Sequence, residues 1–117
     1  MPYNQWIVVD YAAPVFIDRV QILWEAACAA NYDLQTSRDA TNWTTMKSIT
    51  GNTTAASLPG TMPTPPTDWS KSVDTTGLSG VGRYLRVNAT LRCPNNTYGY
   101  SIWEMRSYGD TTSTCMP

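Results

Sequence analysis

Short runs of β-branched and aromatic residues constrain the fold of this chain more than any other feature of its sequence. Alternation of inward and outward side chains within them is typical of strands, and no segment has the longer 3.6-residue period of a core helix. In one run, Tyr32, Leu34 and Thr36 are expected to face inward. The pattern predicts an all-β fold, most simply an antiparallel β-sandwich. Seven strands are expected, at residues 6–11, 15–24, 31–37, 43–50, 69–74, 83–91 and 100–108.

Three segments fall outside this strand pattern. Residues 25–30 are rich in alanine, which favours helix, but they are too few for more than a turn, so we expect a loop there. Residues 51–68 carry four prolines among Thr, Ser and Ala, which predicts a surface excursion. That excursion is either functional or a simple insertion, and we favour an inserted loop. Residues 110–117 form a polar tail, which leaves 1–109 as a single domain.

The composition excludes several function classes. The chain has no His, so catalysis by a Ser-His-Asp or Cys-His arrangement and zinc bound through His are excluded within these 117 residues. Eight basic and nine acidic residues give a net charge of -1, which provides neither a nucleic-acid footprint nor a polybasic membrane patch. No Asp or Glu pair has a spacing that suggests acid/base work, and Asp39 is expected to bond its own turn backbone. Five Trp and seven Tyr suit a binding module rather than an enzyme.

Cysteines and glycosylation sequons favour a secreted protein. Three cysteines allow one internal disulfide and leave one thiol over. Four Asn-X-Thr sequons are candidate glycosylation sites, although a Thr-rich chain also produces such triplets by chance. The first residues have no basic start or apolar run, so an export signal would have to lie outside this chain. The sequons begin at Asn42, Asn52, Asn88 and Asn95.

Four sequence motifs resemble one known family. They are the QWIVVD segment at 5–10, SRDATNW at 37–43, GRYLRV at 82–87 and GYSIWEMRSYG at 99–109. In this order they resemble the discoidin, or coagulation-factor type C, domain, which includes carbohydrate-binding module family 32. The WEAA segment at 24–27 is also similar to a bacterial sugar-binding branch.

The resemblance implies a non-catalytic jelly-roll β-sandwich of the galactose-binding-domain type. Its ligands are glycans, cell-surface groups or phospholipid heads, bound by loops at one end of the sandwich. Family members carry a longer segment before the QW motif, so we expect the first strand to be missing here, either because this chain is a fragment or because another chain supplies that strand. The open sheet edge would then accept a strand from a neighbouring chain. The Pro-rich segment is a second departure from the family pattern.

The resemblance also points to ligand-binding residues in two loops. Glu25 and Arg92 would lie near one another and form a fork for vicinal sugar hydroxyls, although a structural ion pair is the alternative. Tyr98 would stack on a pyranose ring, with Asn95 and Asn96 bonding hydroxyls, unless these side chains only pack the loop. A glycan on Asn95 would block that pocket, so its two roles exclude each other.

Two further roles follow from the family geometry. Cys28 and Cys93 lie in the same pair of loops, which implies a disulfide between them and leaves Cys115 for an interchain link or for a partner cysteine outside this sequence. Glu104 corresponds to a carboxylate that reaches a structural calcium ion, but one carboxylate cannot hold calcium alone. Its alternative role is to pair with Arg106 or another arginine.

The strand patterns place most tryptophans in the core. Trp6, Trp24, Trp43 and Trp103 are expected there, with a role as ligand platforms as the alternative. Trp69 follows the Pro-rich segment, where it could cover the open side of the sandwich.

The function that we predict is a carbohydrate-binding module without cofactor. The alternative is a structural or adhesive building block of an extracellular assembly, completed by strand donation or an interchain disulfide through Cys115. Membrane-surface binding is disfavoured, because exposed hydrophobic spikes and basic clusters are not evident in the sequence.

Overall fold

The computed structural model describes residues 5–24, 27–52, 72–93, 100 and 102–110. All of its strand pairs are antiparallel, which confirms the all-β fold. The described part of the chain has no helix that could cross a membrane. The strands are β1 (Gln5–Trp24), β2 (Ala29–Ser37), β3 (Thr44–Ile49), β4 (Val73–Thr75), β5 (Gly80–Arg92) and β6 (Ile102–Asp110).

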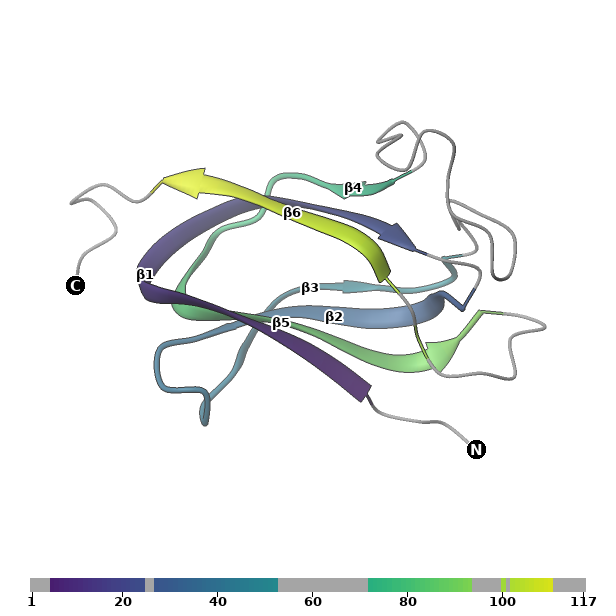
Figure 1. Cartoon of the computed structure of the whole chain (residues 1–117), viewed down its shortest axis with the longest axis horizontal. Coiled ribbons are helices and arrows are strands. Elements are labelled where there is room, and N and C mark those ends of the chain that lie inside the picture. Colours follow the sequence, from purple (N-terminus) through teal and green to yellow (C-terminus); the bar gives the residue numbers. More distant parts are fainter. Residues whose placement is uncertain (1–4, 25–26, 53–71, 94–99, 101, 111–117) are drawn as a thin grey trace.

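One strongly curled sheet makes both layers of the sandwich. Its strand order is β3-β2-β5-β1-β4, and β6 pairs with β1 beside that path. The first half of β1 pairs with β5, whereas its second half pairs with β6 on one side and β4 on the other. In Figure 1, β6, β4 and the second half of β1 form the upper layer. The remaining strands and the first half of β1 form the lower one.

A bulge bends β1 from one layer into the other. We expected two strands, at 6–11 and 15–24, because residues 12–14 read as a turn. That expectation is wrong: Ala12 has a φ of 67°, and the β1–β5 register shifts between Asp10 and Val15. The Asp10 carboxylate accepts a 2.8 Å hydrogen bond from the Ala12 N–H, which holds the bend. The turn signal therefore marks a bulge inside one continuous strand.

Smaller differences lie at the element ends. β2 begins at Ala29, so the last two residues of the expected 25–30 loop are strand, and residues 27–30 form no helical turn. β6 runs through Asp110, the first residue of the expected tail. The strand expected at 69–74 appears as β4 at 73–75, and its first residues lie outside the described part.

The core fills the space between the two layers. Tyr32, Leu34 and Thr36 are buried, which confirms the inward face expected for β2. Tyr32 packs edge-on against Trp24 with ring centroids 5.2 Å apart. Burial raises the pKa of Tyr32 to about 12, because ionisation would place a charge in apolar surroundings.

The tryptophans do not all lie in the core. Trp24 is buried as expected, but Trp6 is 61% exposed and the half-buried Trp43 does not belong to the core cluster, so the expectation is wrong for both. Trp6 pairs with Asn88, whereas its neighbour Ile7 pairs with the buried Val87. Successive residues of a strand face opposite sides, so Trp6 lies on the outer face of the lower layer. The side chain of Trp103 is outside the described set.

Asp39 organises the turn between β2 and β3. Its Oδ1 accepts hydrogen bonds from the N–H groups of Thr41 and Asn42, at 2.9 and 2.8 Å, which confirms the expected turn. The backbone N–H of Asn42, then that of Thr41, holds the pKa of Asp39 well below its usual range. A bidentate ion pair with Arg83 similarly lowers the pKa of Asp10, from 3.8 to about 2.

These two carboxylates predict an acid-labile fold. A lowered folded-state pKa adds stability above the unfolded pKa of 3.8, and this is lost as the pH falls toward about 2. The melting temperature should therefore be steady down to about pH 4 and then decline. In Asp39→Asn the side-chain oxygen can still accept the turn hydrogen bonds but does not titrate, so its decline should be smaller. An identical decline in both proteins, followed by circular dichroism, would contradict this role for Asp39.

Candidate functional site

One end of the sandwich gathers the boundaries of several connecting segments, and we call it the loop end. Strand pairing defines it, because Trp24 pairs with Ile102 and Ala29 pairs with Arg92. β4 begins beside the same end of β1. Figure 1 shows these strand ends on one side of the molecule. The described residues that bound the segments are Trp24, Ala27, Asn52, Ser72, Cys93 and Tyr100.

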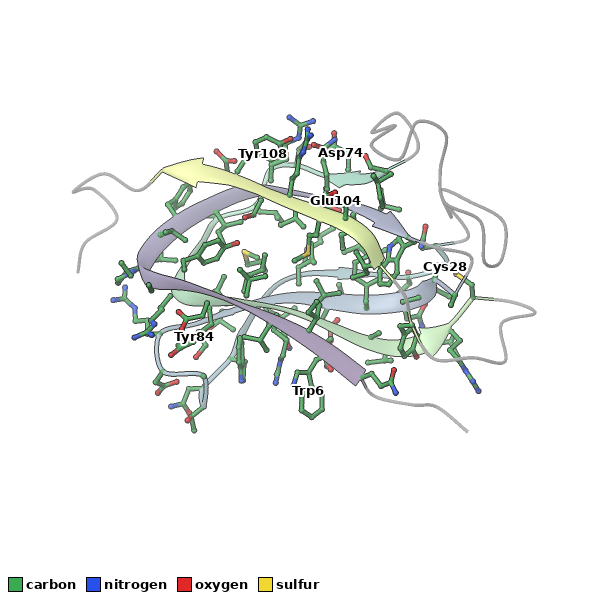
Figure 2. All side chains as sticks on the ribbon, in the orientation of Figure 1. Trp6, Cys28, Asp74, Tyr84, Glu104 and Tyr108 are labelled. Carbon is green, nitrogen blue, oxygen red and sulfur yellow. A yellow bond between two sulfur atoms is a disulfide. The ribbon has the colours of Figure 1, made fainter. Side chains whose placement is uncertain are left out.

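A disulfide closes this end of the β2–β5 pair. Cys28 and Cys93 are bonded, as the family resemblance implied, with Cα atoms 5.4 Å apart. The Cys93 N–H also donates a 3.0 Å hydrogen bond to the Cys28 carbonyl. Both cysteines are buried, and Figure 2 shows Cys28 at the loop end. The start of β2 and the end of β5 are therefore held together covalently.

Asn52 holds the chain that follows β3 against the start of β2, next to the disulfide. Its side-chain Nδ2 donates a 2.9 Å hydrogen bond to the Ala29 carbonyl, and its backbone N–H donates to the Ala30 carbonyl. Asn52 is only 9% exposed, so its Nδ2 does not fit the role of a glycan acceptor in the folded chain. The expected insertion at 51–68 thus begins at a buried anchor, and residues 53–68 lie outside the described part.

Of the five predicted ligand residues, Arg92 lies in the part of the chain that the structure describes. It ends β5, is half-buried and pairs with Ala29. Burial raises the pKa of Tyr100, and the positive charge of Arg92 opposes that rise, so the two side chains interact electrostatically. A cavity of about 160 Å³ adjoins Tyr100 and is lined in part by Trp24 and Trp6. Hydrogen-bond donors and aromatic surface therefore meet at this end.

The other predicted ligand residues are Glu25, Asn95, Asn96 and Tyr98, and they lie outside the described residues. The segments that carry them begin directly after Trp24 and Cys93, both at the loop end. The structure therefore brings together the boundaries of the two expected ligand loops.

Two sequons remain accessible in the described part of the chain. Asn42 is exposed, although its Nδ2 donates to Asp39 at 2.9 Å, and Asn88 is half-buried on the outer face of β5. The sequon at Asn95 lies outside the described residues.

The expected calcium ligand Glu104 does not lie in a metal site that the described residues could form. Glu104 is exposed on β6 opposite Leu23. No group of three or more acidic, His or Cys side chains suited to a metal occurs within the described ranges. Calcium takes six to eight oxygen ligands, so a calcium role for Glu104 would need further oxygen ligands, and it stays a prediction.

Two loop-end residues were missed by the sequence reasoning. Tyr100 stands just before a strand and was counted as part of it; it is half-buried and packs against the core, and nothing in its local sequence indicates a place in the site. Asn52 was treated only as a sequon, and nothing in its local sequence indicates burial.

Comparison with known proteins gives the family. The F5/8 type C domain model matches residues 1–105. Chitosan-binding module 1 of a Paenibacillus sp. chitosanase/glucanase is 33% identical, with a TM-score of 0.71 over 92% of this chain and 70% of that one. Module 2 of the same enzyme, in complex with chitotriose, is also 33% identical, with a TM-score of 0.69 over 89% of this chain and 69% of that one.

A more distant structural relative supports the same fold. A Clostridium perfringens module, in complex with GalNAc-β-1,3-galactose, is 12% identical, with a TM-score of 0.65 over 93% of this chain and 68% of that one. No curated protein matches the chain significantly. From the family model and the two Paenibacillus modules, the chain belongs to the F5/8 type C domain family.

Proposed function

We propose that this chain is a non-catalytic carbohydrate-binding module that binds a sugar unit at the loop end. The observation that carries the proposal is the disulfide-closed corner with Arg92 and Tyr100 beside it, in a chain one-third identical to chitosan-binding modules. Glu25, Asn95, Asn96 and Tyr98 would complete the site from the two adjoining segments.

The chemistry of these side chains suits a sugar. The Arg92 guanidinium offers several fixed N–H donors for vicinal hydroxyls, and the Glu25 carboxylate would accept hydrogen bonds from hydroxyl or amino groups. The faces of Tyr98 and Tyr100 would pack against the C–H side of a pyranose ring. Because the disulfide already holds the ends of β2 and β5 together, less conformational entropy is lost when a ligand binds.

The proposed setting is extracellular. A buried disulfide persists in oxidising compartments, and the accessible sequon at Asn42 fits a secreted glycoprotein. The proposed partner is a glycan rather than a nucleic acid or a membrane. The alternative of a building block linked through Cys115 or an open sheet edge rests on residues outside the described part, and it stays a prediction.

Replacing Arg92 with alanine tests the proposed site. We expect Arg92→Ala to weaken chitotriose binding, measured by titration calorimetry, by roughly tenfold or more, because charge-assisted hydrogen bonds are lost. Arg38→Ala is the matched control, since Arg38 is exposed and follows β2 at the opposite end. Equal affinities of the two variants, both folded, would contradict a ligand role for Arg92.

A further inference from the structure

An apolar cavity opens between the two layers beside the proposed sugar site, and we call it the interlayer cavity. It has a volume of about 160 Å³ and borders Tyr100, whose side chain interacts electrostatically with Arg92. The starts of β1 and β6, both on the loop-end side in Figure 1, supply part of its walls. Its apolar lining consists of Trp6, Ile7, Trp24, Val87, Ala89 and Ile102.

Ile7 leaves apolar surface open inside this cavity. It pairs with Val87, which is only 2% exposed, so the Ile7 side chain lies on the inner face of β1. Ile7 itself is 48% exposed. Within the described ranges, β5 pairs with one side of β1 at Ile7 and no strand pairs with the other. Covering this apolar surface with a ligand group is therefore favourable.

Gln5 adds a neutral hydrogen-bonding group to the cavity. It is exposed, lines the cavity and lies two residues before Ile7, on the same face of β1. Its side-chain amide has both donor and acceptor atoms. None of the described lining residues is acidic, and the nearby Arg92 is positively charged. A cationic ligand group finds no opposite charge among these residues, and its desolvation there is costly.

An acetamido group matches these properties. Its methyl group is apolar, its amide is neutral, and its N–H and C=O groups complement the Gln5 side chain. The cavity is smaller than the about 300–1,000 Å³ of pockets that enclose whole small molecules, so it suits a substituent of a sugar ring. A free amino sugar lacks the methyl group and carries an ammonium charge instead.

We propose that the interlayer cavity binds the acetyl group of an N-acetylated amino sugar, so that the module prefers the acetylated sugar to the deacetylated one. The inference rests on the proposed function, because the sugar ring that carries this group would be held at the loop end by Arg92. It adds the chemical class of the sugar and the residues that select it, Gln5 and Ile7.

Two trisaccharides that differ only in this group provide the test, chitotriose and N,N′,N″-triacetylchitotriose. The wild type should bind the triacetylated probe about tenfold more tightly in titration calorimetry, because a methyl group enters apolar surroundings and no ammonium is desolvated. Nuclear Overhauser effects from the acetyl methyl protons to the methyl groups of Ile7 and Val87 should locate that group without any substitution. Their absence from the complex would overturn the inference.

A charge placed in the cavity should reverse the preference. In Ile7→Asp the new carboxylate attracts an ammonium group, so chitotriose should become the tighter ligand. Val8→Asp is the matched control, because Val8 is 38% exposed on the opposite face of β1 and does not line the cavity. It should keep the wild-type preference. Ile7→Ala, a milder change for use if Ile7→Asp does not fold, should reduce the preference to about threefold.

The outcomes separate this inference from the proposed function. Chitotriose that binds the wild type at least as tightly as the triacetylated probe leaves the loop-end site standing and overturns the cavity. An unchanged preference in folded Ile7→Asp and Ile7→Ala, or a reversal in Val8→Asp as well, also overturns it. A preference with the expected Overhauser effects, but with affinities unaffected by Arg92→Ala, supports the cavity and contradicts the ligand role of Arg92. A wild type that binds neither probe overturns both proposals.

Discussion

Replacing both Cys28 and Cys93 with alanine is expected to lower the free energy of unfolding by about 4 kcal/mol. The bond joins residues 65 positions apart, so its loss frees a long loop in the unfolded chain. Both side chains are buried, and their removal also leaves unfilled space beside β2 and β5. The melting temperature should fall by about 15 °C.

Chemical denaturation measures this loss. The comparison belongs in a Cys115→Ser background, so that no thiol exchange occurs in either protein. A decrease below about 1 kcal/mol would show that the strand ends are held mainly by their hydrogen bonds. In the expected case, binding of chitotriose should weaken as well, because the disulfide holds Arg92 beside the start of β2.

Replacing Gly109 with alanine is the second change with a large expected effect. A Cβ atom built there would lie 1.6 Å from the Phe16 carbonyl oxygen and 2.6 Å from its carbon. These are backbone atoms of β1, so no side chain can move aside to make room. We expect Gly109→Ala to separate β6 from β1 at the Ile17 pairing position and to destabilise the fold by about 3 kcal/mol or more.

Gly77→Ala is the matched control for this prediction. Gly77 has a φ of +72°, but a Cβ added there meets no atom within 4 Å. Its replacement should therefore cost only the conformational strain of alanine, about 1 kcal/mol. Equal unfolding free energies for the two variants, measured in urea, would contradict the close approach at Gly109.

The core was predictable where a strand is apolar on one face only. β2 alternates Tyr32, Leu34 and Thr36 with more polar residues, and its inward face is confirmed. The QWIVVD segment at the start of β1 has apolar residues on both faces. Alternation alone therefore cannot decide between Trp6 and Ile7, and packing against β5 leaves Trp6 outside.

The single β1 strand was not predictable from its local residues. An Ala-Ala-Pro sequence is typical of a turn, and tertiary pairing decides whether such a break ends the strand or bends it. Here Val15 and Ile17 continue to pair with β5 after the bulge, and Ile17 also pairs with β6. These partners are far away in the sequence, so only the assembled sheet shows the crossing between layers.

The candidate site depended on the family resemblance rather than on composition. The disulfide followed from it and is present, which brings the bases of the two expected ligand loops together. The burial of Asn52 was not predictable, because its sequon resembles the exposed one at Asn42. Its hydrogen bonds to Ala29 and Ala30 arise only when β2 and the chain after β3 meet.

Titration of the ¹⁵N-labelled chain with chitotriose, followed by backbone amide chemical shifts, tests the central claim most directly. A sugar bound at the loop end should shift the amides of Ala27, Arg92, Cys93 and Tyr100. The amides of the turn at 38–42, at the opposite end of β2, should stay unchanged and serve as the internal control. Shifts confined to that turn would contradict a loop-end sugar site, and an unchanged spectrum would contradict binding of this sugar.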